Sequence, residues 1–282
     1  MRHLAVMAQA IDFIEAHLRE DVTVSDIAAA VSYSIFHFCR TFNQATHHTP
    51  YDYLMRRRLA EAARELLETD KKIIDLTYEY RFASPETFSR AFKRVFDAQP
   101  NRWRKQTSAQ LSHLMPRLTL AHLEHIAKGP YLKPCIVDRV PLQLTGVMTL
   151  LQGDAVHSLD LWRIFAVELQ HRGELAANDM YSLTIQAETG ARAGRFYLLG
   201  IPLTDTVAVN DAWVTKTLPA GKYVRFIHKG FQCDLPLTLD YIYYTWLPQT
   251  TLQLAAPCLL IRYGPGFEDA EAAECETYLP VK

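Results

Sequence analysis

Residues 82–93 read FASPETFSRAFK, and this stretch decides the fold of the first part of the chain. Ser84 can accept a hydrogen bond from a free N–H of a first helical turn. Pro85 follows at the position where a missing N–H costs nothing. Phe88 and Phe92 lie four residues apart, so they form one buried stripe. The stretch therefore predicts a serine-capped helix with an apolar back and an exposed polar front.

The same pattern occurs once before in the chain. Asp26 and Asp75 open the two copies and lie 49 residues apart, while Ser34 and Ser84 lie 50 apart. Such self-similarity indicates one supersecondary unit used twice. Each copy reads as a short apolar helix, a tight turn and a second helix whose exposed front suits a DNA major groove. The fronts carry Phe36, Cys39, Arg40 and Asn43 in the first copy, and Glu86, Ser89, Arg90 and Lys93 in the second.

A longer helix, expected over 51–69, joins the two units, because this stretch contains no Gly or Pro and has a leucine-rich side. This joining helix should be rigid, because the two helices that read DNA must enter major grooves one turn of DNA, ~34 Å, apart. Arg56, Arg57 and Arg58 are consecutive and spread around this helix. We expect them to be solvated or to contact phosphates rather than bases.

Composition bounds the class of protein. A length of 282 residues suggests about two domains, and the net charge is −1. Residues 1–107 hold 16 Lys and Arg against 14 Asp and Glu, whereas residues 81–105 hold 7 against 2. The basic charge is therefore local to the second helical unit, where it can contact phosphates. No stretch is apolar enough to cross a bilayer, and five scattered cysteines indicate reduced thiols and a cytoplasmic location.

Residues 108–133 are expected to be a linker, broken by Pro116 and closed by Gly129-Pro130. His122 and His125 lie there three residues apart. They allow a metal site, but without a further ligand nearby a solvated or packed helix face is the better interpretation. We expect no metal ion and no cofactor.

The rest of the chain contains a second repeat. Val140-Pro141 and Leu218-Pro219 lie 78 residues apart, and each copy reads strand, strand, helix, strand, strand. The strands are expected near 135–140, 143–150, 180–188 and 195–203, then near 213–218, 222–229, 258–264 and 274–281, with helices near 158–172 and 235–247. The pattern predicts a pseudo-twofold α+β domain with helices packed on antiparallel sheets.

The doubled helical unit resembles the AraC/XylS family of transcription regulators, on the stretch 82–93 with Pro100 and Trp103 after it. The second part resembles the GyrI-like effector-binding domain, on Leu218-Pro219-Ala220-Gly221-Lys222-Tyr223 and the closing stretch 276–281. The order of the two is similar to the Rob-type regulators. The resemblance implies an all-α double helix-turn-helix domain over 1–107, a linker over 108–133 and a GyrI-like domain of two ββαββ halves over 134–282.

The resemblance also implies particular DNA contacts. They fall on Phe36, Cys39 and Arg40 in the first copy, and on Pro85, Glu86, Thr87, Ser89 and Arg90 in the second. Lys93, on the exposed front of the same helix, is a further expected DNA contact. The glycine that the family usually has in each turn is replaced here by Ser32 and Arg81, so local geometry must accommodate both side chains.

In related effector domains, a glutamate at the place of Glu276 faces cationic, hydrophobic ligands. Aromatic rings with a carboxylate suit a cation, and the expected ring residues are Tyr241, Tyr244, Trp246 and Tyr263. Glu276 could equally be a solvated strand residue, because Glu274 and Tyr278 share its face.

The leading hypothesis is a transcription regulator, expected to activate, that binds double-stranded DNA as a monomer. The resemblance implies RNA polymerase and a small-molecule effector as partners. Two alternatives stay open. One is a GyrI-like hydrolase in which Glu276 works with Tyr263 or His228, although no catalytic triad, metal cluster or phosphate loop demands it. The other is a module that sequesters a protein. Cys39 is either a redox switch or a small residue tolerated at the DNA face.

Overall fold

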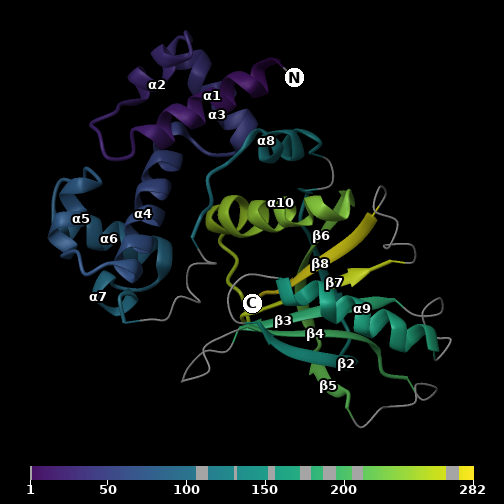
Figure 1. Cartoon of the computed structure of the whole chain (residues 1–282). Coiled ribbons are helices and arrows are strands. Elements are labelled where there is room, and N and C mark those ends of the chain that lie inside the picture. The colour runs from purple at the N-terminus through teal and green to yellow at the C-terminus, as the bar shows by residue number, and fades with distance from the viewer. Residues whose placement is uncertain are drawn as a thin grey trace. The chain divides into compact units, whose positions relative to one another are not determined.

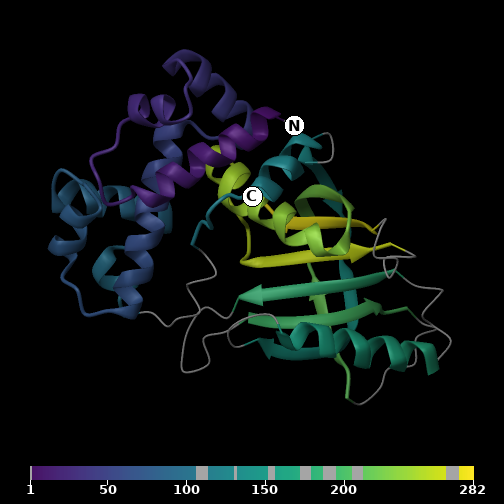
Figure 2. The same ribbon diagram turned by 45° about the horizontal axis from the view of Figure 1, so that its top comes forward.

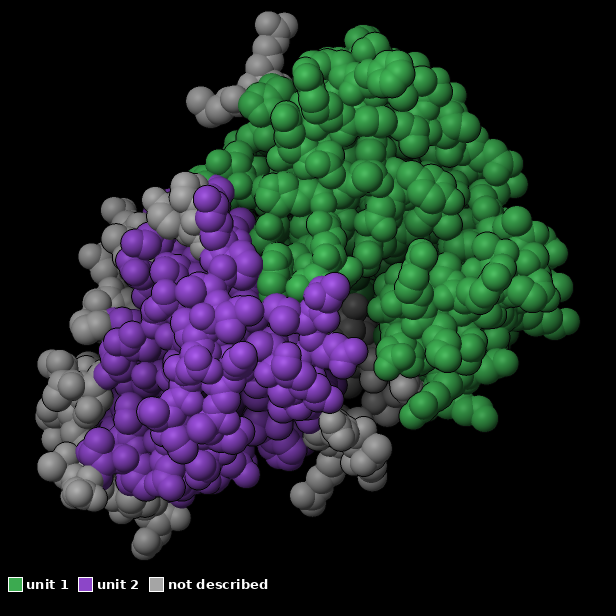
Figure 3. All heavy atoms as spheres, turned by 180° about the vertical axis from the view of Figure 1, so that it is seen from behind, with its two compact units in different colours: residues 1–128, 236–250 green, residues 129–235, 251–282 purple. Residues whose placement is uncertain are grey.

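The computed structural model describes residues 2–105, 114–129, 132–151, 156–171, 179–186, 195–204, 212–264 and 273–282. The chain forms two compact units, coloured separately in Figure 3. The first comprises Met1–Lys128 and Pro236–Thr250, and the second comprises Gly129–Leu235 and Thr251–Lys282. Residues 236–250, which the sequence groups with the second domain, thus belong to the first compact unit.

Helices build the first unit (Figure 1). Two helix-turn-helix pairs, α2–α3 and α5–α6, flank the long helix α4, so the predicted duplication is confirmed. The bounds are α1 Arg2–Ala16, α2 Val24–Ala30, α3 Ile35–Thr46, α4 Pro50–Glu68, α5 Ile73–Glu79, α6 Pro85–Phe96, α7 Pro100–Trp103 and α8 Leu120–Ala127.

Local sequence signals fix where these helices start. Thr23 accepts a hydrogen bond from the backbone N–H of Asp26 at 3.3 Å, and the Asp26 carboxylate accepts from the N–H of Thr23 at 2.8 Å. This closed pair begins α2. Helix α4 begins with Pro50, and Thr49 before it accepts from the N–H of Asp52 at 3.1 Å.

One core unites the helical unit. The apolar face of α1 is fully buried at Met7, Ile11 and Ile14. Leu118 and Leu123, in the stretch expected to be a linker, are buried in this same core. Residues 114–128 are therefore an ordered part of the first unit.

The second unit is built on one antiparallel sheet of eight strands, in the order β1-β6-β8-β7-β3-β4-β2-β5. The order is symmetric about β7 and β3, and the first strand of each half pairs with the second strand of the other. This confirms two ββαββ halves. The bounds are β1 Cys135–Arg139, β2 Leu142–Leu151, β3 Met180–Gln186, β4 Arg195–Pro202, β5 Val214–Leu218, β6 Gly221–Gly230, β7 Cys258–Tyr263 and β8 Ala273–Pro280.

The helices of the two halves differ in their surroundings. Helix α9, Val156–His171, lies along one face of the sheet (Figure 2) and packs against β2 and β4. The helical segment of the second half consists of the short 3-10 turn η3, Gln232–Asp234, then α10, Leu235–Asp240, the π-helix η4, Tyr241–Trp246, and the 3-10 turn η5, Leu247–Gln249. Its residues from Pro236 onward belong to the first unit.

Candidate nucleic-acid interface and effector site

Both expected reading helices, α3 and α6, begin at a serine as predicted. Ser34 accepts a hydrogen bond from the N–H of His37 at 3.4 Å, and Ser84 accepts from the N–H of Thr87 at 3.2 Å. Pro85 is the first residue of α6. Matching caps give the two helices the same starting point relative to their exposed faces.

The backs of α3 and α6 are also alike. Phe38 and Phe42 are fully buried with ring centroids 5.4 Å apart, and Phe88 and Phe92 are fully buried with centroids 5.5 Å apart. These four rings are core residues, as predicted. Because they fix each helix from behind, the opposite side chains of both helices face outward.

Most of the predicted DNA contacts lie on these outward faces. Phe36 is 90% exposed, more than any other large apolar side chain in the described part of the chain. Also exposed are Arg40, Glu86, Thr87, Arg90 and Lys93. Cys39, Pro85 and Ser89 are half-buried. The structure therefore brings six of the nine predicted residues fully to the surface, and their contact with DNA stays a prediction.

The turns within the two units share one unusual conformation. Ser32 has φ 58° and Arg81 has φ 62°, in the left-handed region that favours glycine. In both turns the N–H of the next residue donates to the carbonyl oxygen five residues before it, at 2.9 Å. The serine and the arginine thus adopt the glycine-like turn that the resemblance implies at these places.

The interpretation of the arginine run on α4 is wrong for two of its three members. Arg57 and Arg58 are 4% and 5% exposed, so they are neither solvated nor available to phosphates. Arg57 donates to the two carboxylate oxygens of Glu15, each at 2.8 Å, and to Glu61 at 2.7 Å. These bonds join α1 to α4.

Arg58 and Arg56 have different partners. Arg58 donates to the backbone carbonyls of Leu18 at 2.9 Å and Glu20 at 2.6 Å, and so fixes the chain that leaves α1. Arg56 is half-buried and pairs with Asp52 one turn earlier at 2.8 Å. The run is a structural joint, because its charges are used inside the unit.

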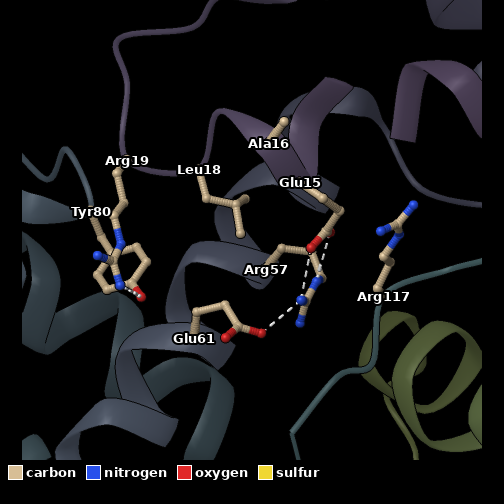
Figure 4. A pocket seen from close by; sticks show the side chains of 8 residues that line it. All are labelled: Glu15, Ala16, Leu18, Arg19, Arg57, Glu61, Tyr80 and Arg117. Carbon is tan, nitrogen blue, oxygen red and sulfur yellow. Dashed lines mark hydrogen bonds and ion pairs between the residues drawn. The ribbon is translucent and has the colours of Figure 1, made fainter. Parts of the chain in front are cut away.

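A hollow of about 440 Å³ lies beside this joint (Figure 4). Its charged side chains are largely paired. Arg57 bonds Glu15 and Glu61, and Arg117 pairs with Asp12 outside the hollow. The lining residues are Glu15, Ala16, Leu18, Arg19, Arg57, Glu61, Tyr80 and Arg117. Since these charges already have partners, we assign the hollow no ligand.

A second charged network links α4 and the chain after α1 to the second helix-turn-helix pair. Glu65 of α4 accepts from Lys71 at 2.7 Å and from the Tyr80 hydroxyl at 2.8 Å, and it also pairs with Arg19. Lys71 reaches Glu79 of α5 at 2.9 Å. Burial raises the pKa of Glu65, but the hydrogen bonds from Lys71 and Tyr80 and the charge of Arg19 outweigh it, so the pKa lies below its usual value.

In the second unit, Glu276 on β8 is bonded on both oxygens. Arg225 donates to Oε1 at 3.0 Å, while Arg262 and the Tyr278 hydroxyl donate to Oε2 at 2.9 and 2.7 Å. Burial raises the pKa of Glu276, but the bonds from Tyr278 and Arg262 outweigh it and leave the pKa below its usual value. The carboxylate is therefore ionised and already compensated.

Further positive charge surrounds this group. The Arg139 guanidinium lies 4.1 Å from the centre of the Tyr278 ring. Arg262 also donates to Asp179 at 2.9 Å. The cluster of Arg139, Arg225, Arg262, Asp179 and Glu276 therefore carries three positive charges against two negative ones.

The ring residues expected around Glu276 are not gathered there by the sheet. Arg262 lies opposite Glu276 across β7 and β8, so the next residue, Tyr263, points to the other face. There its hydroxyl bonds Ser182 at 2.9 Å and its ring meets Trp162 of α9 at 4.8 Å. Tyr263 is thus a core residue under α9. The other three candidates, Tyr241, Tyr244 and Trp246, belong to the first unit.

The hydrolase alternative loses its expected grouping for the same reason. His228 lies opposite Cys275 across β6 and β8, so it shares a face with Tyr263 and not with Glu276. It is 1% exposed and its Nε2 lies 3.0 Å from the carbonyl oxygen of Phe231. Neither expected partner lies on the face of the sheet that carries Glu276.

The sequence did not predict that four histidines share one partner segment. His47, His48, His122 and His125 all contact the segment 236–249. His122 and His125 therefore lie on a packed helix face, as preferred over the metal site. The described residues hold no group of three or more His, Cys, Asp or Glu side chains placed to bind a metal ion.

The five cysteines are free thiols. Cys39 is half-buried on α3, and burial raises the pKa of Cys275 to about 12. Within the described part of the chain, no helix is both long and apolar enough to span a bilayer.

Two families match separate parts of the chain. Residues 27–106 match a helix-turn-helix domain of the AraC type, and residues 152–282 match the GyrI-like small molecule binding domain. The first match runs from within α2 through α7, and the second covers α9, the strands from β3 onward and the segment 236–249.

Full-length relatives share this arrangement. The chain is 32% identical to the right origin-binding protein of Escherichia coli K12 and 24% identical to the transcriptional regulator Rob of Salmonella typhimurium, with 100% of each chain covered. It is also 38% identical over 104 residues to the HTH-type regulator YbfP of Bacillus subtilis, a match that spans 37% of this chain and 35% of that protein. The chain therefore belongs to the Rob family of AraC-type DNA-binding transcriptional regulators, with a helix-turn-helix domain followed by a GyrI-like domain.

Proposed function

We propose that one copy of the chain binds DNA with α3 and α6 in neighbouring major grooves, and that Arg40 and Arg90 read bases there. The observation that carries this is their equivalent, exposed placement in two structurally matched helices. Among the described residues Arg40 forms no hydrogen bond or ion pair. A guanidinium without a protein partner can bond the O6 and N7 of guanine.

Other side chains of the same faces supply position and selectivity. Phe36 can contact a thymine methyl group, and Glu86 can accept from cytosine N4. Hydrogen bonding from Ser84 holds the pKa of Glu86 below its usual value, so it is an anion that rejects a nearby phosphate. Lys93 and Arg94, both exposed in the last turn of α6, suit phosphate contacts.

Selection of bound duplexes from a random pool, followed by titration of one selected duplex, tests this proposal. Arg40→Ala and Arg90→Ala should each weaken binding by about 1–3 kcal/mol and relax the preference at separate base pairs. Arg64→Ala is the matched control, because Arg64 is exposed and belongs to α4 rather than to α3 or α6. Unchanged affinity and preference in Arg40→Ala and Arg90→Ala would remove these residues from the readout.

We also propose that a small molecule acting on the GyrI-like part modulates this binding. Support comes from the family match and from the ionised Glu276. The side chains that now donate hydrogen bonds to this carboxylate can be displaced by a ligand. A cationic ligand would have to compete with Arg225 and Arg262 for the carboxylate. Fluorescence titration of the full chain with a hydrophobic cation tests this, with Glu276→Gln expected to lose the response and an anionic dye as the contrasting probe.

Activation would further require contact with RNA polymerase, which the family membership supports. A transcription assay with purified polymerase on the selected duplex tests this step. The expected result is more transcript in the presence of the chain, lost in Arg40→Ala and Arg90→Ala. No change with the wild-type chain would contradict an activating role.

A further inference from the structure

The segment 236–249 belongs to two parts of the molecule at once. By sequence it lies inside the GyrI-like region, between β6 and β7, yet it packs in the first unit. Thr238, Ile242 and Thr245 along it are at most 1% exposed. Helix α9, which occupies the same place in the other half of the repeat, stays in the second unit and packs on β2 and β4. One of two repeated helices has thus acquired a different partner.

The segment contacts the end of the first reading helix. His47, which ends α3 in a left-handed conformation, places its Nδ1 3.0 Å from the Tyr241 hydroxyl. The next residue, His48, places its Nε2 3.0 Å from the Thr245 hydroxyl. Gln249 donates to the backbone carbonyl of His47 at 2.7 Å. Three bonds therefore hold the chain where α3 stops.

A second anchor lies on α8. The Nδ1 of His122 accepts from the backbone N–H of Thr119 at 3.1 Å, so its Nε2 carries the hydrogen that bonds Asp240 at 3.1 Å. His125 bonds the hydroxyl of Thr238 at 2.8 Å. Imidazoles from two different helical regions thus meet hydroxyls and a carboxylate along one segment.

The backbone of this segment is unusual where the contacts to α3 occur. Residues Tyr241–Trp246 form a π-helix between an α-helical turn and a 3-10 turn. π-helical turns are rare in proteins, and those that occur are often found at functional sites. Both Tyr241 and Thr245 lie within it, so any rewinding of this turn would move the two hydroxyls that bond His47 and His48.

We infer that residues 236–249 form a coupling helix, which links the state of the GyrI-like region to the reading helix α3. This inference rests on the proposed reading role of α3. The chain connects the coupling helix covalently to β6 on one side and β7 on the other, so a change at these strands reaches its ends. Linkage is reciprocal: DNA bound at α3 must stabilise the docked segment by the same factor as docking favours DNA.

Hydrogen exchange on the full chain, with and without a duplex selected from a random pool, tests the coupling. DNA should slow exchange in α3 and, by about fivefold or more, in residues 236–249. The double variant Tyr241→Phe/Thr245→Val removes two hydroxyls at nearly constant volume. It should lose the slowing in 236–249 and change the affinity for the duplex by about fivefold or more. Thr251→Val, at an exposed threonine just beyond the segment, should behave as the wild type.

The outcomes separate this inference from the proposed function. Slowing in α3 without slowing in 236–249 of the wild-type chain would overturn the coupling and leave the reading role intact. Absence of slowing in α3 would instead overturn the reading role. If the double variant fails to fold, Gln249→Ala replaces it, because this side chain is exposed and donates to the carbonyl of His47. That variant should likewise reduce the slowing in 236–249.

Discussion

Replacing Arg57 by methionine should destabilise the first unit strongly and leave its phosphate contacts unchanged. Arg57 is 4% exposed, and its guanidinium bonds Glu15 twice, Glu61 once and the carbonyl oxygen of Met115 at 2.6 Å. Methionine keeps most of the apolar stem but supplies no N–H donor. The buried Glu15 carboxylate, whose side chain is 10% exposed, would lose its countercharge.

The size of the effect follows from this geometry. Removing one partner of a buried ion pair costs about 3–5 kcal/mol, because the remaining charge stays buried without compensation. At roughly 4 °C per kcal/mol for a domain of this size, the transition should fall by roughly 10–20 °C. Arg64→Met is the matched control. Arg64 is exposed and 3.8 Å from Glu61, so its loss should change stability by about 0.5 kcal/mol or less.

Two measurements on the same variants decide the matter. Thermal unfolding followed by circular dichroism gives the stability, and titration of a selected duplex at several salt concentrations, well below the transition, gives the number of phosphate contacts. Arg57→Met should keep the wild-type salt dependence. A transition equal to that of the wild type, with a salt slope lowered by about one, would mean that Arg57 contacts a phosphate and is not a structural joint.

Three further predictions concern the local structure of the helical unit. Ser32→Gly should raise the stability by up to about 1 kcal/mol in urea unfolding, because φ 58° strains a residue with a Cβ, whereas Ser25→Gly inside α2 should lower it. Ser84→Ala should cost about 1 kcal/mol in the same assay through loss of the α6 cap, and an unchanged midpoint would argue against that cap. Because the folded-state pKa of Glu65 is depressed, its stabilising effect is complete at neutral pH, above its unfolded-state pKa, and is lost as the pH falls through the folded-state pKa. Glu65→Gln should therefore flatten the fall in unfolding free energy between neutral and acidic pH, while Glu68→Gln, at an exposed position, should leave the curve as in the wild type.

Local patterns predicted most of the fold because the signals that start and stop these elements act over a few residues. The strand expected near 222–229 is β6, Gly221–Gly230, and the helix expected near 158–172 is α9, Val156–His171. The serine caps and the phenylalanine stripes are equally local, since each depends on residues three or four apart. Their duplication made the expectation stronger, because two copies had to satisfy it.

Features that depend on distant pairing escaped the sequence. Whether Arg57 faces water or core depends on Glu15, which comes from another helix, although Glu61 at i+4 was a visible hint. Likewise, the face on which Tyr263 lies follows from its position opposite Cys275, a pairing between strands with no local signature. Alternation along one strand shows which of its side chains share a face of the sheet. Only the register between two strands shows which side chains of one strand share a face with those of the other.

The same limit on prediction from sequence applies to the two ββαββ halves. Repetition shows that both halves contain a helix, but not which core each helix enters. Helix α9 fully buries Phe165 and Leu169, whereas the coupling helix fully buries Thr238 and Thr245 against imidazoles, with Ile242 between them. Burial of large apolar side chains contributes about 1.5–3 kcal/mol each, while a hydroxyl–imidazole bond contributes about 1 kcal/mol net. The hydroxyl–imidazole bonds of this contact can open at modest cost, because water replaces them. This balance is what the proposed coupling between the GyrI-like region and α3 requires.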